Sequence, residues 1–383
     1  MSRLQALPIL DQAENPFVGL RPFDTKEAIR FFGRGDQTAE LLSRINNPRF
    51  LSVVGSSGCG KSSLIRAGMI PKLRAGLLVD NRDRWLVASM NPGSQPRKNL
   101  ATALLQTLPG STQPSVAENF AQHIHEYGVT ALVEALGKPL ERENANLLLL
   151  VDQFEEIFRF GVNTRQPQRR AEAQDFVSLM LALADQRESS VYVVMTMRSD
   201  FLGDCDAFPG LPEAMNRSQY LVPRLNRRQL IAAIEGPVHL GGKSIAPRLV
   251  DRLLNDLGDS TDELPALQHV LMRVWEAADA IGSSELDLEH YQTIGTLKNA
   301  LSLHAEKALI GLDDDQVQRV FRALTHTDES NRRIRRAITV KQLLAETEIP
   351  RNDLNAIVDA FRRHDRSFLM PPETVELQDT SVV

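Results

Sequence analysis

The sequence predicts an α/β protein whose core is a doubly wound, parallel, five-stranded sheet, followed by a helical domain and a winged-helix-like domain. Short apolar segments alternate with helical segments over residues 49–224, and residues 225–287 carry only helical periodicity. Residues 288–383 show helical segments followed by a hairpin pattern. The 383 residues exceed what one hydrophobic core usually supports. We therefore expect a lead-in at 1–48, three domains with these bounds, and a last domain that is incomplete.

Composition limits the classes of protein to which the chain can belong. Hydrophobic residues make up 42% and charged residues 24%, which is ordinary for a soluble globular protein. A net charge of -5 gives no general attraction to nucleic acids or anionic membranes. The 2 cysteines are too few for a disulfide framework and suit a reducing compartment. Because the sequence shows neither a signal peptide nor a run of roughly 18 apolar residues, we expect a cytoplasmic protein without a membrane partner.

The first strand leads into the most informative motif of the chain. Residues 50–54 form a short apolar run typical of a buried strand. The residues that follow, GSSGCGKS, fit the pattern G-x-x-x-x-G-K-[ST] at every fixed position, and 63–67 continue as a helix. A glycine-rich turn that matches by chance is the alternative interpretation. The strand and helix on either side favour a phosphate loop.

The residue types in this loop suit polyphosphate binding. Glycines allow backbone N–H groups to approach phosphate oxygens closely, and the helix that follows adds unpaired donors and the positive end of its dipole. We expect Lys61 to reach the β and γ phosphates and Ser62 to offer its hydroxyl to Mg²⁺. The predicted nucleotide contacts of the loop are Gly55, Ser56, Ser57, Gly58, Cys59, Gly60, Lys61, Ser62 and Ser63.

Acidic residues follow the third predicted strand. The second strand is expected at 84–90, and an unbroken apolar run predicts the third at 146–152. Asp152 ends this strand, where it would hold the hydration shell of Mg²⁺ opposite Ser62. Either Glu155 or Glu156 would orient the attacking water. Alternatively, both glutamates are acids of a first helical turn, favoured there by the helix dipole.

The fourth and fifth strands complete the predicted sheet. Residues 190–198 form the fourth strand, and Arg198 lies at its carboxyl end, the edge at which parallel sheets bind ligands. A guanidinium there would contact the γ phosphate, and a salt bridge to Asp200 or Asp204 is the alternative. A short fifth strand is expected at 220–222.

The segments outside the predicted sheet carry weaker signals. The aromatic residues of 15–33 form either an apolar surface for a purine or a lid on the core. Gly236 and Pro237 are expected to end the first helix of the helical domain. Residues 366–370 and 374–377 are expected to pair as a hairpin, which suggests a winged helix. The strongest basic cluster would contact nucleic acid, or else is solvated or paired with acids, and consists of Arg332, Arg333, Arg335 and Arg336.

Together these segments resemble the STAND-type NTPases, a signal-transducing branch of the AAA-like P-loop proteins, and in particular the novel STAND ATPases of bacteria. The matching segments are NPFVGLRPF and FFGRGD before the loop, GSSGCGKSSL at the loop, LLLLVDQFEEIF and TMRSDF at two strands, and EGP at 235–237. The loop motif is common to NTPases in general, whereas DQFEE and FFGRGD are what indicate the novel STAND group.

This resemblance implies a strand order of 5-1-4-3-2 and a role in signalling such as antiviral defence. It also implies that Gly33 and Arg34 lie near the adenine, that Arg198 senses the γ phosphate, and that Pro237 packs against the base or ribose. Such proteins carry a histidine just after the winged-helix hairpin, which this chain lacks. We therefore expect the chain to be the N-terminal part of a longer protein.

Three functional hypotheses follow. The first is a slow, regulatory ATPase switch in which bound ADP keeps the later domains folded over the nucleotide, and exchange for ATP permits homo-oligomerisation. Its further partners would be C-terminal sensor or effector modules. The second, less favoured, is a DNA-acting AAA-like ATPase that grips a duplex with its winged helix. The third is a scaffold that binds ATP without hydrolysing it.

Overall fold

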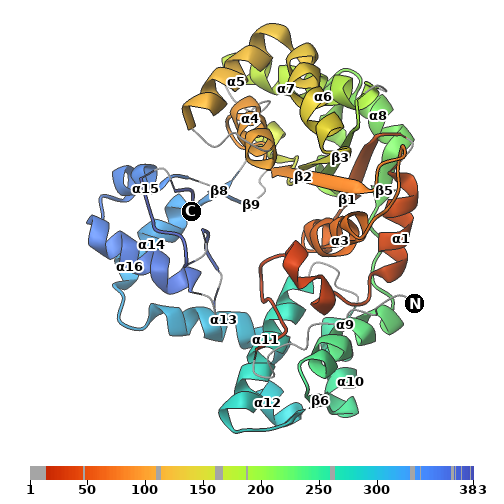
Figure 1. Cartoon of the computed structure of the whole chain (residues 1–383). Coiled ribbons are helices and arrows are strands. Elements are labelled where there is room, and N and C mark those ends of the chain that lie inside the picture. The colour runs from red at the N-terminus through yellow and green to blue at the C-terminus, as the bar shows by residue number, and fades with distance from the viewer. Residues whose placement is uncertain are drawn as a thin grey trace, which may run out of the picture. The chain divides into compact units, whose positions relative to one another are not determined.

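The computed structural model forms two compact units, the sheet unit at Pro22–Ala233 and the helical unit at Met1–Arg21 with Ile234–Val383 (Figure 1). It describes residues 14–45, 48–108, 114–159, 167–186, 189–258, 264–327, 333–336, 338–363, 366, 368–371, 373–379 and 381–383. In this part of the chain, no helix has both the length and the hydropathy that crossing a membrane requires.

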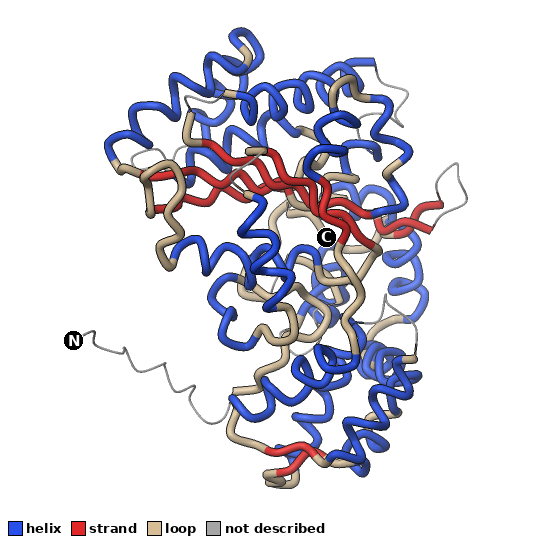
Figure 2. Tube along the Cα trace, turned by 90° about the vertical axis from the view of Figure 1, so that its right-hand side faces the viewer, coloured by secondary structure: helices blue, strands red, loops and turns tan. Residues whose placement is uncertain are grey.

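The sheet unit contains the predicted five-stranded parallel sheet, whose strands run side by side in Figure 2. The strand order β2-β3-β4-β1-β5 confirms the expected 5-1-4-3-2 arrangement. Each strand lies within one residue of its predicted bounds, namely β1 Phe50–Gly55, β2 Arg84–Met90, β3 Ala145–Val151, β4 Val191–Arg198 and β5 Gln219–Leu221. All residues of β1 and β3 are buried, as expected for strands covered on both faces.

Helices cover both faces of this sheet, as Figure 1 shows. One face packs against α4 Pro96–Thr107, α5 Pro114–Tyr127, α6 Val129–Arg142, α7 Pro167–Asp185 and α8 Leu211–Ser218. The other face packs against α1 Gly35–Arg44 and the helix that follows the loop. Because β1 and β4 are both covered, the two apolar cores meet across the strands that lead to the predicted site.

The helix after the loop is not a regular α-helix. It begins as α2 Lys61–Ser63, widens to the π-helical η2 Leu64–Met69, and returns to α geometry in α3 Ile70–Arg74. The wide turns end just before Pro71, whose nitrogen cannot donate a helical hydrogen bond. Gly68 lies in η2 at a close approach to α1, since a Cβ there would lie 2.6 Å from Oγ1 of Thr38.

The helical unit is built mainly from short helices. Its helices are α10 Pro247–Leu257, α11 Leu264–Ala280, α12 Leu288–Thr293, α13 Thr296–Leu309, α14 Asp314–Ala323, α15 Val340–Thr347 and α16 Arg351–Arg362. Two small sheets join them, β6 Ser244–Ile245 with β7 Glu285–Leu286, and β8 Thr325–Thr327 with β9 Arg333–Arg335. Helix α10 buries one apolar stripe, which includes Leu249, Val250, Leu253 and Leu254.

The predicted helix end at Gly236 and Pro237 is wrong. Helix α9, Arg227–Leu240, runs through both residues. Pro237 removes one helical N–H donor, but Ile234, Pro237 and Val238 are buried on one stripe of the helix. Burial of this stripe compensates for the missing hydrogen bond.

The predicted hairpin at 366–370 and 374–377 is also wrong. The described residues of this segment form turns and loops, and the antiparallel hairpin of the unit is instead β8 with β9. The amides of Phe368 and Leu369 donate to the carbonyl of Phe361 at the end of α16. Guanidinium groups of Arg362 and Arg351 donate to the carbonyls of Val375 and Leu377. These bonds occupy backbone groups that a hairpin needs. Because the hairpin was the basis for predicting a winged helix, the winged helix itself stays a prediction.

The structure places part of the basic cluster. Arg333 and Arg335 lie on β9, and Arg332 lies outside the described residues. The Arg336 guanidinium makes two hydrogen bonds of 2.6 and 2.7 Å to the carboxylate of Glu346. At this residue the structure therefore shows pairing with an acid.

Candidate nucleotide site

The loop between β1 and α2 is a tight turn that depends on its glycines. Gly58 and Gly60 adopt φ angles of +72° and +90°, a region that residues with a side chain rarely adopt. A Cβ at Gly55 would lie 2.7 Å from the sulfur of Cys59, which is itself buried beneath the loop. The sequence GSSGCGKS therefore combines two glycines for the turn, one for close packing, and a small apolar side chain that fills the interior.

Lys61 is buried and directed back into the loop. Its Nζ donates to the carbonyl oxygens of Gly55 at 2.9 Å and Ser56 at 2.6 Å, and only 9% of the residue is exposed. Both partners are neutral acceptors, so the ammonium charge has no carboxylate partner among the described residues. An anionic oxygen at the loop would offer the stronger, charge-assisted hydrogen bond.

Asp152 lies one residue beyond β3 and is almost fully buried, at 1% exposed. Its Oδ1 accepts hydrogen bonds from Oγ of Ser62 at 2.8 Å and Oγ1 of Thr196 at 2.5 Å. Its Oδ2 accepts from Nη2 of Arg66 at 2.7 Å. The structure thus brings Ser62 and Asp152 together, and this pair of hard oxygen atoms fits the ligand preference of Mg²⁺.

Glu155 and Glu156 follow Asp152 in the chain, and their side chains have different surroundings. Gln153 has a φ of +55°, which turns the chain sharply after Asp152. Glu155 is buried, and its Oε2 accepts the backbone N–H of Arg198 at 3.3 Å. Burial raises the pKa of Glu155, and the positive charge of Lys61 acts in the opposite direction.

Glu156 is directed to another strand end. Its Oε2 accepts the backbone N–H of Gly93, in the loop after β2, at 2.9 Å. Burial raises the pKa of Glu156, and the neighbouring charge of Glu155 adds to the rise. The two acids therefore bind the backbone at different strand ends, Glu155 at β4 and Glu156 after β2.

Arg198 lies at the end of β4 opposite Gly55 in the register of β1 and β4. Its guanidinium donates to both carboxylate oxygens of Asp200, at 3.0 and 2.6 Å, and lies 5.7 Å from the ring centre of Phe201. The salt bridge named as the alternative role is therefore present. A phosphate contact would require Arg198 to exchange this partner.

Comparison with known proteins places the chain in a family. The model of the family described as Novel STAND NTPase 1 matches residues 16–379, which is most of the chain. The chain belongs to this novel STAND NTPase family. The match confirms the resemblance drawn from DQFEE and FFGRGD, and it makes the chain a member of a P-loop nucleoside triphosphatase family.

No curated protein sequence matches this STAND NTPase. Among solved structures, it is similar to the ORC2 protein of Aeropyrum pernix in ADPNP–ADP complexes, with a TM-score of 0.49, 15% identity, and 82% and 77% of the two chains covered. It is also similar to Drosophila ORC bound to DNA, with a TM-score of 0.47, 16% identity, and coverage of 93% and 86%. Cdc6p from Pyrobaculum aerophilum gives a TM-score of 0.42, 13% identity, and coverage of 85% and 84%.

Three residues lie at the site of this STAND NTPase that the sequence patterns did not predict there. Arg66 follows Ser62 by four residues, a helical spacing that would have indicated a shared face. Thr196 reaches Asp152 only because β4 lies beside β3, which the sequence pattern alone does not reveal. The guanidinium of Arg159 lies 5.8 Å from the ring centre of Phe201, and its charge lowers the pKa values of Glu155 and Glu156.

The lead-in of the STAND NTPase packs directly on the loop. The buried guanidinium of Arg34 donates to the carbonyls of Cys59 at 2.9 Å and Pro223 at 2.7 Å, and burial lowers its pKa. The backbone N–H of Phe23 donates to Oγ of Ser63 at 3.2 Å. Arg34 thus connects the loop with the end of the fifth strand. The expected adenine contacts of Gly33, Arg34 and Pro237 stay predictions.

Gly33 allows the first residues of α9 to approach the lead-in, which generates a testable prediction. It adopts φ +82°, and a Cβ there would lie 2.4 Å from the carbonyl oxygen of Gln229. Gly33→Ala should therefore lower the free energy of unfolding of the sheet unit by about 2 kcal/mol or more, from backbone strain and this clash. Urea denaturation measures the change.

Gly35→Ala is the matched control, because nothing lies within 4 Å of a Cβ at Gly35. It should change the free energy of unfolding by no more than about 0.5 kcal/mol. Equal stability of the two variants would show that the close approach of Gly33 to Gln229 is absent in solution.

Proposed function

We propose that this chain is a magnesium-dependent ATPase that acts as a signal-transduction switch. The observation that carries the proposal is the cluster at the carboxyl edge of the sheet, where Lys61 occupies the loop, Ser62 contacts Asp152, and the buried Glu155 accepts the backbone N–H of Arg198. Membership in a STAND NTPase family supports nucleotide turnover by this cluster. ATP and ADP are the nucleotides that we assign to it.

Binding would use the loop and its lysine. The backbone N–H groups of 55–60 and of the first helical turn would contact the phosphates, and Lys61 would give up its carbonyl partners for phosphate oxygens. Ser62 and Asp152 would hold Mg²⁺, which neutralises charge on the phosphates during transfer. Asp152 can then retain Thr196 and Arg66 as hydrogen-bond donors.

Hydrolysis would use Glu155 as the general base. A carboxylate accepts a proton from water most effectively when its pKa lies close to the working pH, and burial moves the pKa of Glu155 in that direction. Its hydrogen bond from the Arg198 amide fixes the carboxylate at the end of β4. Glu156 would instead anchor the loop after β2 through Gly93.

The switch would depend on which nucleotide is bound. Moving a population from 1:99 to 99:1 takes about 5.5 kcal/mol of differential binding. A charge-assisted hydrogen bond contributes about 1.5–3 kcal/mol. Arg198 must also give up Asp200 to meet a γ phosphate, so its net contribution is smaller. Lys61, Mg²⁺ and contacts elsewhere in the chain must therefore share the discrimination between ADP and ATP.

The DNA-acting alternative has less support from the structure. It depends on the arginines at 332–336, of which Arg336 forms a bidentate ion pair with Glu346. We therefore propose the switch and not the DNA-acting function.

Replacing the two glutamates separately tests the assignment of the base. Glu155→Gln should lower ATP turnover by about 100-fold or more, whereas Glu156→Gln should lower it less than about tenfold. Because the base must be ionised and its pKa is raised, wild-type turnover should rise as the pH increases through that pKa and be lost below it. Phosphate release, measured between pH 5 and 8, checks both expectations. Equal losses in the two variants would contradict the assignment.

The same variant tests the switch. Glu155→Gln keeps ATP intact, so ATP should produce a larger assembly than ADP if nucleotide state controls oligomerisation. Light scattering after gel filtration gives the mass in each nucleotide. An identical mass with ATP and with ADP would dismiss the switch while leaving the ATPase assignment in place.

A further inference from the structure

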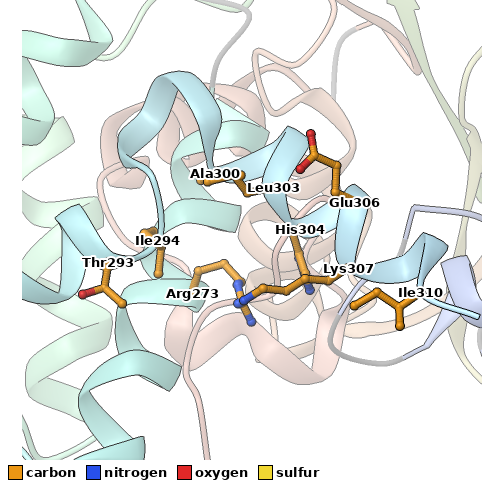
Figure 3. A pocket seen from close by; sticks show the side chains of 9 residues that line it. All are labelled: Arg273, Thr293, Ile294, Ala300, Leu303, His304, Glu306, Lys307 and Ile310. Carbon is orange, nitrogen blue, oxygen red and sulfur yellow. The ribbon is translucent and has the colours of Figure 1, made fainter.

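A pocket of about 330 Å³ lies on the helical unit, formed by α11, α13 and the turn between α12 and α13. Figure 3 shows its lining side chains. We refer to it as the cationic pocket, and its residues are Arg273, Thr293, Ile294, Ala300, Leu303, His304, Glu306, Lys307 and Ile310. It shares no residue with the nucleotide site.

Two cations converge in this pocket. The guanidinium of Arg273 and the ammonium of Lys307 point toward one another from α11 and α13 (Figure 3). Arg273 forms an ion pair with Glu276, whereas Lys307 has no ion-pair partner among the residues that the structure describes. The carboxylate of Glu306 extends away from the two cations (Figure 3). The centre of the pocket therefore carries an excess of positive charge.

His304, which lines the pocket, forms a buried pair with His269, and this pair adds no charge at neutral pH. Nδ1 of His304 lies 3.3 Å from Nε2 of His269, and the ring of Phe368 packs against both. Burial, reinforced by the charge of Arg273, lowers the pKa of His304 to about 3 and that of His269 to about 4. Arg366 and Lys307 lower the pKa of His304 further, as does His269. Because Arg273 is paired with Glu276, the excess positive charge available to a ligand is that of Lys307, with the Arg273 guanidinium beside it.

Apolar side chains line the rest of the pocket. Ile294 and Ala300 are buried, whereas Leu303 and Ile310 are 40% and 81% exposed. Apolar side chains that line the same pocket as two cations suit a ligand with both an apolar and an anionic part. The volume lies at the small end of the range for ligand pockets, about 300–1,000 Å³.

We propose that the cationic pocket binds a small amphiphilic organic anion, whose phosphate or carboxylate group lies between Arg273 and Lys307 and whose apolar body contacts Ile294 and Leu303. Arg273 is held in place by Glu276, and the Lys307 carbonyl accepts a 3.5 Å hydrogen bond from Arg366.

Hexyl phosphate and hexanoate are probes for this site, with hexylammonium as the probe of opposite charge. Isothermal titration of the full chain should show binding of at least one of the two anions and none of hexylammonium. Lys307→Gln should weaken anion binding by about tenfold or more, because it removes one charge-assisted hydrogen bond. Which anion binds identifies the headgroup.

Lys298→Gln is the matched control, because Lys298 is an exposed lysine on the same helix that does not line the pocket. It should bind the anion with wild-type affinity, and both variants should keep the wild-type melting temperature because both lysines are exposed. The proposal is overturned if neither anion binds the wild type, if hexylammonium binds equally well, or if the two variants show the same affinity.

Discussion

The candidate site depends on one buried carboxylate, that of Asp152. A buried charge is unfavourable unless it is paired and hydrogen-bonded. Here the loop helix contributes Ser62 and Arg66, and the neighbouring strand contributes Thr196. These three donors join the first, third and fourth strands of the chain at one point. The same contacts leave the Ser62 hydroxyl beside a carboxylate oxygen, as a magnesium site requires.

Sheet topology explains why this point exists. Because the strands are parallel, their carboxyl ends share one edge, and the order β3-β4-β1 brings Asp152, Thr196 and the loop to neighbouring positions on it. Burial on both faces then removes water from the strand ends, which raises the pKa of Glu155. The apolar runs of the sequence thus create both the position and the electrostatics of the proposed base.

Short-range sequence patterns single out most residues of the candidate site. The apolar runs predicted the five strands, and the loop motif predicted the strand and the helix on either side of it. Contacts between distant residues were harder to foresee. Thr196 required the strand order, and the hairpin at 366–377 failed because arginines of α16 take its carbonyl groups. Pro237 remained helical because burial of its stripe outweighs one missing hydrogen bond.

The central claim is that Lys61 binds the phosphates of a nucleotide at this loop. The most direct measurement is the dissociation constant of a fluorescent ADP analogue for wild type and for Lys61→Ala, with equal melting temperatures confirming that both are folded. The account predicts that Lys61→Ala binds about 100-fold more weakly or not at all, because a buried charge-assisted contact is lost. Wild-type affinity in Lys61→Ala would contradict it.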